Sequence, residues 1–410
     1  MQKRLQYKHL IFREFYYSNS LSCAELSARI GKSIPLTTQI LNDLMEEGIV
    51  EEEGLAPSNG GRRPLMYSIK KEAMYVVAVA MDQMVTRVAV IGFDNKPIGI
   101  PLHFDLTLAD NPDALTQLKD AIETTLKKSK VPRKKILGVG IGMPGFIDAR
   151  KGINYSFLST DNSGSISAYL HKELGVPVYI DNDSSIIALA EHHFGAAMGV
   201  KNSMVINIGW GIGLGLILND QLYRGENGFA GEFSHIPMYD NNKLCSCGKR
   251  GCLETETSLK VVIEKAEQGL KKKGVSSCLK KDFRTGLIEN DWHAIVKAAQ
   301  SGDEYVIRLL TAAGYDIGRG VAILIHLFNP EVVVLSGRGS QVGRLWQAPV
   351  LQAVNEHCIP RLAGNTVIKV SNIGYRAELI GAAALVLENL VRSKEKLRTP
   401  RPQPNSISTV

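Results

Sequence analysis

A short cysteine-rich run with one histidine upstream constrains this chain more than any other feature. Three cysteines fall in the pattern C-x-C-x4-C, and a histidine lies ten positions before the first of them. Three thiolates and one imidazole fill every position of a tetrahedral Zn²⁺, so such a site has a structural role. Glu232 and Glu254 flank the run, which favours a zinc-clamped loop that presents polar groups to a ligand. The four candidate metal ligands are His235, Cys245, Cys247 and Cys252.

The remaining cysteines and the composition narrow the class of protein. Cys23, Cys278 and Cys358 are scattered, which indicates one metal site and isolated thiols rather than a disulfide framework. The chain has 410 residues, so two or three domains are expected. It has neither an apolar run long enough to span a bilayer nor the apolar core of a signal peptide. We therefore expect a cytoplasmic protein without a membrane partner, whose net charge of +7 permits contact with nucleic acid.

Residues 1–70 carry a pattern of three helices followed by two short strands. An amphipathic helix is expected around residues 10–15, and the capping box S-C-A-E at 22–25 opens a second helix. After a Gly-Lys turn, a third helix is predicted over 33–48, where Gly48 suits the left-handed position that ends a helix. Two strands around a Gly-Arg-Arg tip complete the plan of a winged helix-turn-helix. The alternative is a small helical domain that binds another protein.

The third helix would read DNA if this module is a winged helix-turn-helix. The N-terminal part of such a helix meets base edges in the major groove. Gln39 and Asn42 could pair with adenine, and Leu36 could meet a thymine methyl group. The helix carries no Arg or Lys, so phosphate contacts must come from elsewhere, with Lys3, Arg4 and Lys8 as further candidates. The arginines at the wing tip suit a narrow minor groove, or simply form a solvated turn. The candidate DNA contacts are Lys32, Ser33, Leu36, Thr38, Gln39, Asn42, Arg62 and Arg63.

Residues 71–392 alternate strands and helices in two similar halves, each opening with a β-hairpin. This predicts an α/β protein of two lobes with a cleft between them. The segment 393–410 is polar and rich in proline, so we expect a disordered tail. Strands are expected at 75–80, 87–93, 136–141, 176–180, 204–208, 213–218 and 332–336, and helices at 113–128, 185–194, 261–328 and 377–391.

Three segments in these lobes could contact a ligand. The run D-N-D-S at 181–184 lies between a strand and a helix, so its acid either caps the helix or faces the cleft as an acceptor or general base. Gly145 lies in a turn after a buried strand, where its backbone could bond a ligand or merely reverse the chain. The alternating glycines of 209–215 could let backbone N–H groups approach a phosphate, or simply form a hairpin.

Together these segments resemble the ROK family of repressors, open reading frames and sugar kinases, most strongly its repressors. The run C-S-C-G-K-R-G-C-L-E is similar to the family's C-x-C-G-x-x-G-C-x-E signature. E-F-S-H is similar to its E-x-G-H motif with Ser234 in place of glycine, and D-N-D is similar to its E-N-D segment. The resemblance implies an actin-like ATPase (ribonuclease H-like) fold and zinc at the Cys/His run. It also implies sugar contacts by Gly145, Asn182, Asp183, Glu232, His235 and Glu254.

One departure from the family pattern bears on catalysis. The kinases of the family carry D-x-G-G-T-K in the first hairpin, whereas this chain has D-Q-M-V-T-R at 82–87. Met84 and Val85 put side chains where glycine would let the backbone approach a phosphate. The sequence therefore argues against ATP binding, although Asp183, the base that the kinases would use, is present.

These expectations combine into one leading function and two rivals. The leading one is a sugar-responsive transcriptional repressor, a homodimer or tetramer, that binds a palindromic operator and takes a sugar or sugar phosphate in the cleft. The first rival is an ATP-dependent sugar kinase with a fused DNA-binding domain and Asp183 as catalytic base. The second is a repressor regulated by a protein partner instead of a sugar.

Overall fold

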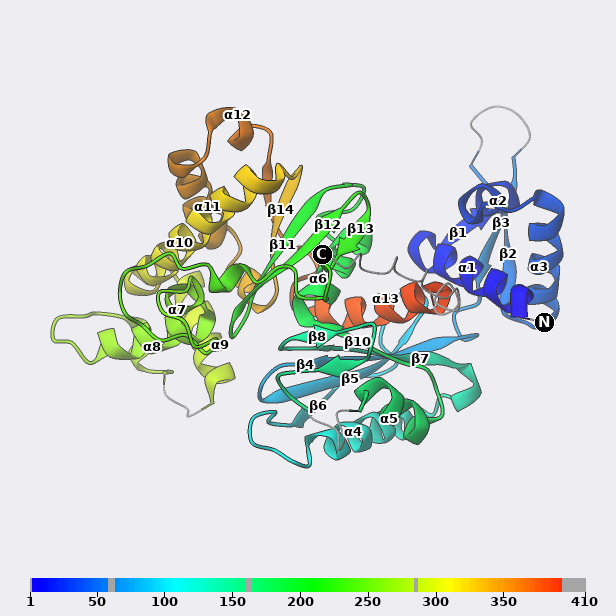
Figure 1. Cartoon of the computed structure of the whole chain (residues 1–410), viewed down its shortest axis with the longest axis horizontal. Helices are drawn as coiled ribbons and strands as arrows, with labels where there is room; N and C mark the ends of the chain where they lie inside the picture. The colour runs from blue at the N-terminus through cyan, green and yellow to red at the C-terminus, as the bar shows by residue number, and fades with distance from the viewer. Residues whose placement is uncertain (1, 58–62, 159–163, 284–286, 393–410) are drawn as a thin grey trace, which may run out of the picture. The chain divides into compact units, whose positions relative to one another are not determined.

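The chain divides into two compact units. The computed structural model describes residues 2–57, 63–158, 164–283 and 287–392 (Figure 1). One unit contains the chain up to Met74 together with the segment from Val386 onward, and the other spans Tyr75–Leu385. The segment expected to be a disordered tail and the tip of the expected wing, including Arg62, lie outside the described residues.

The first unit has the helices and strands of a winged helix-turn-helix. Ser22 caps the second helix through the N–H of Glu25 (3.3 Å), and the Glu25 carboxylate accepts the N–H of Ser22 (2.8 Å), which confirms the capping box. Gly48 has a φ of 69° after the third helix, as expected. The elements are α1 Gln2–Ser18, β1 Ser20–Ser22, α2 Cys23–Ile30, α3 Ile34–Glu46, β2 Val50–Leu55 and β3 Leu65–Ile69, with strand order β1-β3-β2.

The C-terminal end of the chain's last described helix, α13 Ala377–Arg392, belongs to the first unit. The Tyr17 hydroxyl donates to the Glu388 carboxylate at 3.0 Å, and Nδ1 of His9 lies 3.2 Å from the Leu390 carbonyl oxygen. These contacts join the helix end to α1, so the first unit is closed by residues from both ends of the sequence.

The second unit repeats one sheet topology twice. In each sheet the first three strands form antiparallel pairs, and two further strands are added in parallel on the other side of the first strand. The shared order confirms the expected two similar lobes. The first sheet is β10 Val178–Asn182, β7 Ile136–Met143, β4 Tyr75–Met81, β5 Val85–Gly92 and β6 Leu102–Asp105. The second is β13 Gln221–Tyr223, β12 Ile212–Leu218, β11 Ser203–Ile208, β14 Val332–Ser336 and β15 Val367–Val370.

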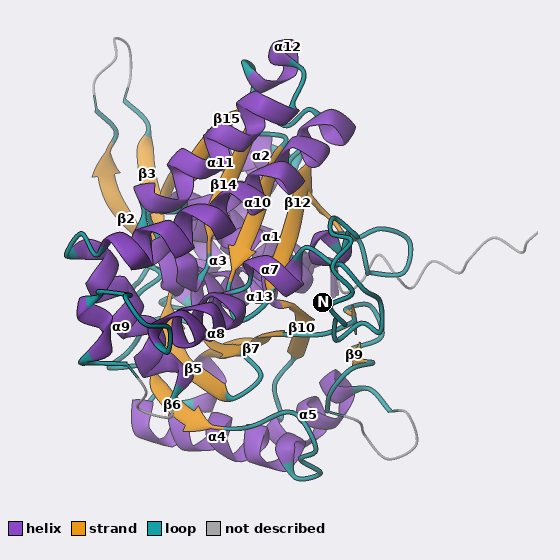
Figure 2. Ribbon diagram, turned by 90° about the vertical axis from the view of Figure 1, so that its left-hand side faces the viewer, coloured by secondary structure: helices purple, strands orange, loops and turns teal. Residues whose placement is uncertain are grey.

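Helices cover the outer face of each sheet and separate the two lobes. In Figure 2, α4 and α5 run along the first sheet, and α10 and α11 lie beside the second. α6 packs on β11 and β12, and a Cβ at Gly381 of α13 would lie 1.9 Å from the Ile186 carbonyl oxygen of α6. The helices are α4 Ala114–Ser129, α5 Ile166–Leu174, α6 Asp183–Phe194, α7 Glu254–Thr257, α8 Leu259–Leu270, α9 Ile288–Gln300, α10 Glu304–Phe328, α11 Arg344–His357 and α12 Pro360–Ala363; β8 Ile147–Asp148 and β9 Ile153–Asn154 form a small hairpin.

Two features of the helical layer differ from the sequence-based expectation. The long helical stretch expected over 261–328 is divided into α8, α9 and α10, and between α9 and α10 Gly302 adopts a φ of 80° and Asp303 caps α10 by accepting the Val306 N–H (3.1 Å). α11 was not among the expected helices, and it contains Pro349, a residue that normally breaks helices. The proline ring instead packs at Gly314 of α10, where a Cβ would lie 2.7 Å from it. None of the helices in the described part of the chain has the length and apolar character to cross a bilayer.

Candidate ligand cleft and metal centre

A cleft of about 340 Å³ opens in the second unit, lined by residues of both lobes. Its walls come from the end of β4, the β10–α6 junction, the turn between β11 and β12, and the segment that follows β13. All six residues expected to contact a ligand line this cleft: Gly145, Asn182, Asp183, Glu232, His235 and Glu254. Gly145 and Glu254, which are 109 positions apart in the sequence, thus line the same cleft.

Asn182, rather than an acid or a serine, caps the helix at the β10–α6 junction. Its Oδ1 accepts the N–H groups of Ser184 (2.9 Å) and Ser185 (3.4 Å), and its Nδ2 donates to the Gly145 carbonyl oxygen (3.3 Å). Gly145 has a φ of 102°, and a Cβ there would lie 2.7 Å from the Ser156 side chain. The cap and the glycine turn therefore hold each other in place, and the Asp183 carboxyl is available to the cleft.

Asp183 is a carboxyl group that can change its charge near neutral pH. Its Oδ1 accepts the Ser184 N–H (2.7 Å), and its Oδ2 accepts the Asn207 side-chain amide (3.3 Å). Burial raises the pKa of Asp183 to about 7, and the Glu378 and Asp82 carboxylates add to the rise. Such a group can accept a proton from a hydroxyl, or accept a hydrogen bond from it when ionised.

Glu232 and Glu254 approach the cleft from the two ends of the cysteine-rich segment. Glu254 begins α7, and its Oε2 accepts the Ile212 N–H at 3.2 Å. Glu232 Oε2 lies 3.5 Å from His235 Nε2. Burial raises the pKa of Glu232 and the Glu254 carboxylate adds to this, whereas His235 opposes it. Both acids can therefore offer oxygen acceptors to a polar ligand.

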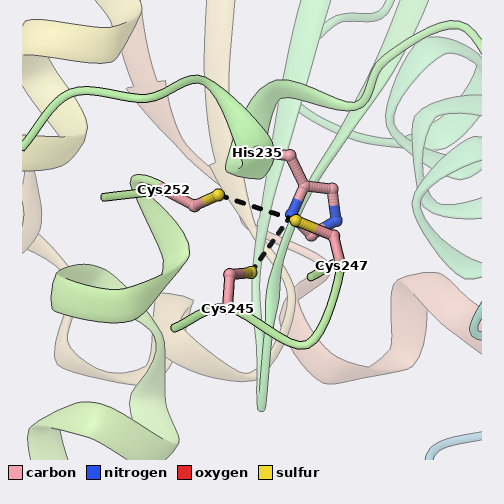
Figure 3. Close-up of side chains that lie close together, drawn as sticks. All are labelled: His235, Cys245, Cys247 and Cys252. Atoms are coloured by element: carbon pink, nitrogen blue, oxygen red, sulfur yellow. Dashed lines mark hydrogen bonds between the residues drawn. The ribbon is translucent and has the colours of Figure 1, made fainter. Parts of the chain in front are cut away.

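The Cys/His cluster forms a compact set of four ligand atoms (Figure 3). His235 Nδ1 lies 3.5 Å from Cys245 Sγ, Cys247 Sγ lies 3.7 Å from Cys252 Sγ, and all four ligand atoms are within 4.8 Å of one another. The loop depends on Gly251, whose φ is 73° and where a Cβ would lie 1.9 Å from the Tyr239 carbonyl oxygen. This cluster could hold a metal ion, with Nε2 of the histidine directed to Glu232.

The end of the cleft next to the β4–β5 turn contains a group of charged and aromatic side chains that the sequence did not reveal. Arg338 lies at its centre and is only 4% exposed. Its Nη2 donates to Asp82 (3.0 Å) and to the Tyr375 hydroxyl (2.8 Å), its Nη1 pairs with Glu289, and Trp210 Nε1 donates to Asp82 (3.2 Å). The guanidinium lies over the rings of Trp210 (4.5 Å) and Tyr375 (4.3 Å). We call these five residues, Asp82, Trp210, Glu289, Arg338 and Tyr375, the Arg338 cluster.

A second ion pair adjoins this cluster. Arg87 of β5 pairs with Glu378 of α13, and the Arg87 guanidinium lies 3.4 Å from the centroid of the Tyr375 ring. Glu378 also lines the cleft. In the sequence Arg338 stands between two glycines in S-G-R-G, and no local pattern marks it as part of a site.

At this end of the cleft, the backbone groups and glycines that could bind a phosphate make contacts within the protein instead. Asp82 Oδ1 accepts the N–H groups of both Met84 and Val85 at 2.8 Å. In the glycine-rich hairpin, a Cβ at Gly213 would lie 1.9 Å from Ser184 Oγ, and one at Gly215 would lie 2.4 Å from the Ala188 Cβ. Both glycines are therefore required for α6 to pack against β12. This role fits a simple hairpin better than a phosphate-binding loop.

The candidate DNA contacts of the first unit are largely on its surface. Arg4 and Lys8 of α1 form ion pairs with Asp43 of α3 and with Glu47, which follows α3, so both cations are engaged within the unit. The Lys32 ammonium lies 5.2 Å from the centroid of the Tyr7 ring. Ser33, Thr38, Gln39, Asn42 and Arg63 are exposed, and Lys32 and Leu36 are half-buried.

Comparison with known proteins agrees with this architecture. A xylose repressor of Caldicellulosiruptor bescii is 28% identical over 397 residues, which is 95% of this chain and 97% of that protein. A glucokinase of Halalkalibacterium halodurans is 31% identical over 274 residues, 66% of this chain and 82% of the glucokinase. The crystal structure of a ROK family transcriptional regulator, described as a homologue of the E. coli MLC protein, superposes with a TM-score of 0.76 at 24% identity, covering 94% of this chain and 96% of that one. It shares the fold, which confirms the expected actin-like lobes joined to a helix-turn-helix unit. The ROK family profile matches residues 109–389, more than half of the sequence, and the chain therefore belongs to the ROK family.

Proposed function

We propose that this chain is a DNA-binding transcriptional repressor that responds to a sugar bound in the cleft of its second unit. The repressor relative aligns with nearly the whole chain, whereas the glucokinase aligns with about two thirds of it. Residues 1–70 would be the DNA-binding domain and residues 71–392 the ligand-binding domain. The ligand would be a sugar or a sugar phosphate.

One observation carries this proposal. The cleft has polar side chains that can bind a sugar, while backbone N–H groups that a phosphate would need are bonded within the protein. Asp183 and Glu254 offer acceptors for hydroxyl groups. The N–H groups of Met84 and Val85, which a phosphate would need, are bonded to Asp82. A cleft of this kind binds a sugar without transferring phosphate to it, which is the requirement for a sensor.

The sugar would act by shifting a population of lobe arrangements. A ligand that binds one arrangement better than another stabilises it by the difference in affinity. In a homodimer or tetramer on a palindromic operator, the two recognition helices must match the half-site spacing, so a small rigid-body change is enough to release the DNA. The DNA contacts would be Lys32, Ser33, Leu36, Thr38, Gln39, Asn42, Arg62 and Arg63.

We propose that the ion held by His235 and the three cysteines is structural Zn²⁺. Tetrahedral zinc with Zn–S bonds of about 2.3 Å and a Zn–N bond of about 2.0 Å requires S···S distances of about 3.8 Å and S···N distances of about 3.5 Å. The separations here are 3.7 Å between Cys247 and Cys252 and 3.5 Å between Cys245 and His235. Zinc would fix the tautomer of His235 and hold Glu232 beside it.

The test of the proposed function is operator binding titrated with monosaccharides. The full chain would first select its operator from fragmented genomic DNA. Xylose, glucose and N-acetylglucosamine, and the phosphate ester of each, would then be titrated against the complex in a fluorescence anisotropy assay. We expect at least one sugar to lower DNA affinity about tenfold or more. Operator binding that no sugar or sugar phosphate changes would exclude the sensing role and favour regulation by a protein partner.

An active sugar kinase is the second candidate function, and Asp183 is the observation that favours it. Its carboxyl group, with a pKa of about 7, could act as general base toward a sugar hydroxyl. A coupled assay of ADP release across hexoses and pentoses decides between the two functions. Turnover above about 1 s⁻¹, the lower end of the range of ordinary kinases, would reverse the ranking.

Glu232→Gln is expected to weaken the sugar response without changing operator affinity in the absence of sugar. The amide keeps the size of the side chain but loses a charged acceptor, which costs about tenfold in sugar affinity. The measurement is the sugar concentration that half-releases the operator. Glu226→Gln, at an exposed position outside the cleft, serves as the control. An unchanged response of the Glu232 variant would remove this residue from the sugar site.

Sugar affinity is expected to rise with pH through the titration of Asp183. An ionised Asp183 accepts a hydroxyl hydrogen bond better than a protonated one, so a pKa of about 7 makes binding release a proton below pH 7. Affinity should therefore increase about tenfold between pH 6 and pH 8 and level off above that range. Calorimetric titrations across this interval measure the effect. Asp183→Asn should bind more weakly and show a flat profile, whereas a variant profile that keeps the slope would assign the titration to another group.

A further inference from the structure

The charges in the cleft distinguish a free sugar from a sugar phosphate as the ligand. We infer that the effector is an uncharged monosaccharide, and that the Arg338 cluster excludes sugar phosphates and nucleotides from the cleft. This inference rests on the proposed sugar-binding function and narrows its ligand class. It depends on three observations. Few cationic donors line the cleft, carboxylates outnumber these cations, and backbone N–H groups near the β4–β5 turn are bonded to the protein.

The cleft offers a phosphate almost no free cationic donor. Phosphate recognition relies on Arg or Lys side chains with N–H groups directed at the anion. Among the described residues that line the cleft, Arg338 alone carries a guanidinium or ammonium group. Both of its terminal nitrogens are engaged, Nη1 by Glu289 and Nη2 by Asp82 and Tyr375, and two aromatic rings cover its faces. A phosphate could reach this group only by displacing the half-buried carboxylates of Asp82 and Glu289.

Carboxylates outnumber cations around the same space. A dianionic phosphate ester would meet this excess negative charge in a partly desolvated site, where charges interact more strongly than in water. The hydroxyl groups of a free sugar, in contrast, donate hydrogen bonds to carboxylates and carry no charge. The carboxylates that line the cleft are Asp82, Asp183, Glu232, Glu254 and Glu378.

Several backbone N–H groups that could hold an anion at this end of the cleft are engaged by the protein. Phosphates can also be held by successive free N–H groups in a glycine-rich turn. Here Met84 and Val85 donate to Asp82, Gly209 donates to the Gly211 carbonyl oxygen (2.9 Å), and Ile212 donates to Glu254 (3.2 Å). Two N–H groups in each of the two turns that would approach a phosphate are thus bonded to acceptors of the protein itself.

The experiment compares each free sugar with its own phosphate ester on the metal-loaded full chain. Isothermal titration calorimetry would be run with xylose and xylose 5-phosphate, glucose and glucose 6-phosphate, and N-acetylglucosamine and its 6-phosphate, with ATP–Mg²⁺ as a further probe. We expect at least one free sugar to bind, its ester to bind at least about 100-fold more weakly, and ATP–Mg²⁺ not to bind. An ester that binds as tightly as its free sugar, or binding of ATP–Mg²⁺, overturns the inference while leaving the sugar site in place. Absence of binding by every free sugar and every ester instead removes the sugar site, and the inference with it.

A charge variant tests whether the carboxylates cause the exclusion. Glu378→Gln removes one negative charge from the cleft and releases Arg87 from its ion pair. The ratio of ester to sugar affinity should rise about tenfold. The exposed control Glu226→Gln should leave this ratio unchanged. A ratio that does not move in Glu378→Gln, in a variant that still binds the free sugar, would contradict the electrostatic cause.

Discussion

Replacing Cys247 with Ser is expected to lower the metal affinity of the chain by more than about 100-fold and to abolish the sugar response. Cys247 supplies one of four ligand atoms and itself lines the cleft. Glu254 follows Cys252 by two residues, and His235 holds Glu232, so a loop without its ion loses the position of both acids. Metal content by mass spectrometry and sugar titration of the operator complex measure the two effects.

The control for this variant is Cys278→Ser, which changes an exposed cysteine outside the cluster. It should keep one metal ion per chain and a normal response. Full metal occupancy in Cys247→Ser would contradict the ligand assignment. Loss of metal with an intact sugar response would instead separate the metal loop from the cleft.

The double substitution Gln39→Ala and Asn42→Ala is expected to abolish sequence-specific DNA binding. Both side chains are exposed on α3, and each bidentate contact with a base contributes about 1–3 kcal/mol of discrimination. Operator affinity should fall about 100-fold or more, whereas affinity for unrelated DNA should change little because phosphate contacts remain. Fluorescence anisotropy with specific and scrambled duplexes gives both values.

Sugar binding shows whether this variant is folded. Calorimetry should give the double variant the same sugar affinity as the unaltered protein. Gln300→Ala, an exposed amide of α9 in the second unit, serves as the matched control. If the double variant binds its operator normally, α3 is not the recognition helix, and the alternative of a protein-interaction domain gains support.

Features that depend on neighbouring residues were predictable from the sequence. The capping box at Ser22 and Glu25 and the left-handed Gly48 each involve contacts within a few positions, and the structure has both. The three cysteines share one loop with His235 ten residues upstream of the first, and the structure brings all four candidate ligands together. The expected hairpins, buried strands and wing strands are also present.

Other details could not be read from local patterns. α11 contains Pro349, a residue that normally breaks helices, and its ring packs at Gly314, which lies 35 positions earlier in the chain. An acid of the segment D-N-D-S was the expected cap of α6, whereas in the structure Asn182 caps this helix. The glycines at 213 and 215 suited either a phosphate-binding loop or a hairpin. Atoms of α6 lie so close to both that neither position has room for a side chain, which favours the hairpin.

The sequence by itself indicated the type of each unit and the Cys/His cluster, because periodicity and short spacings report directly on local structure, and the resemblance of its motifs to the ROK family indicated the six residues that meet in the cleft. Only the tertiary structure decided what fills the other end of that cleft. Trp210 and Arg338 reach Asp82 across 128 and 256 residues of sequence, and neither contact leaves a local pattern. The charge balance around a ligand depends on which distant side chains pair, and that pairing exists only once the two lobes have packed together.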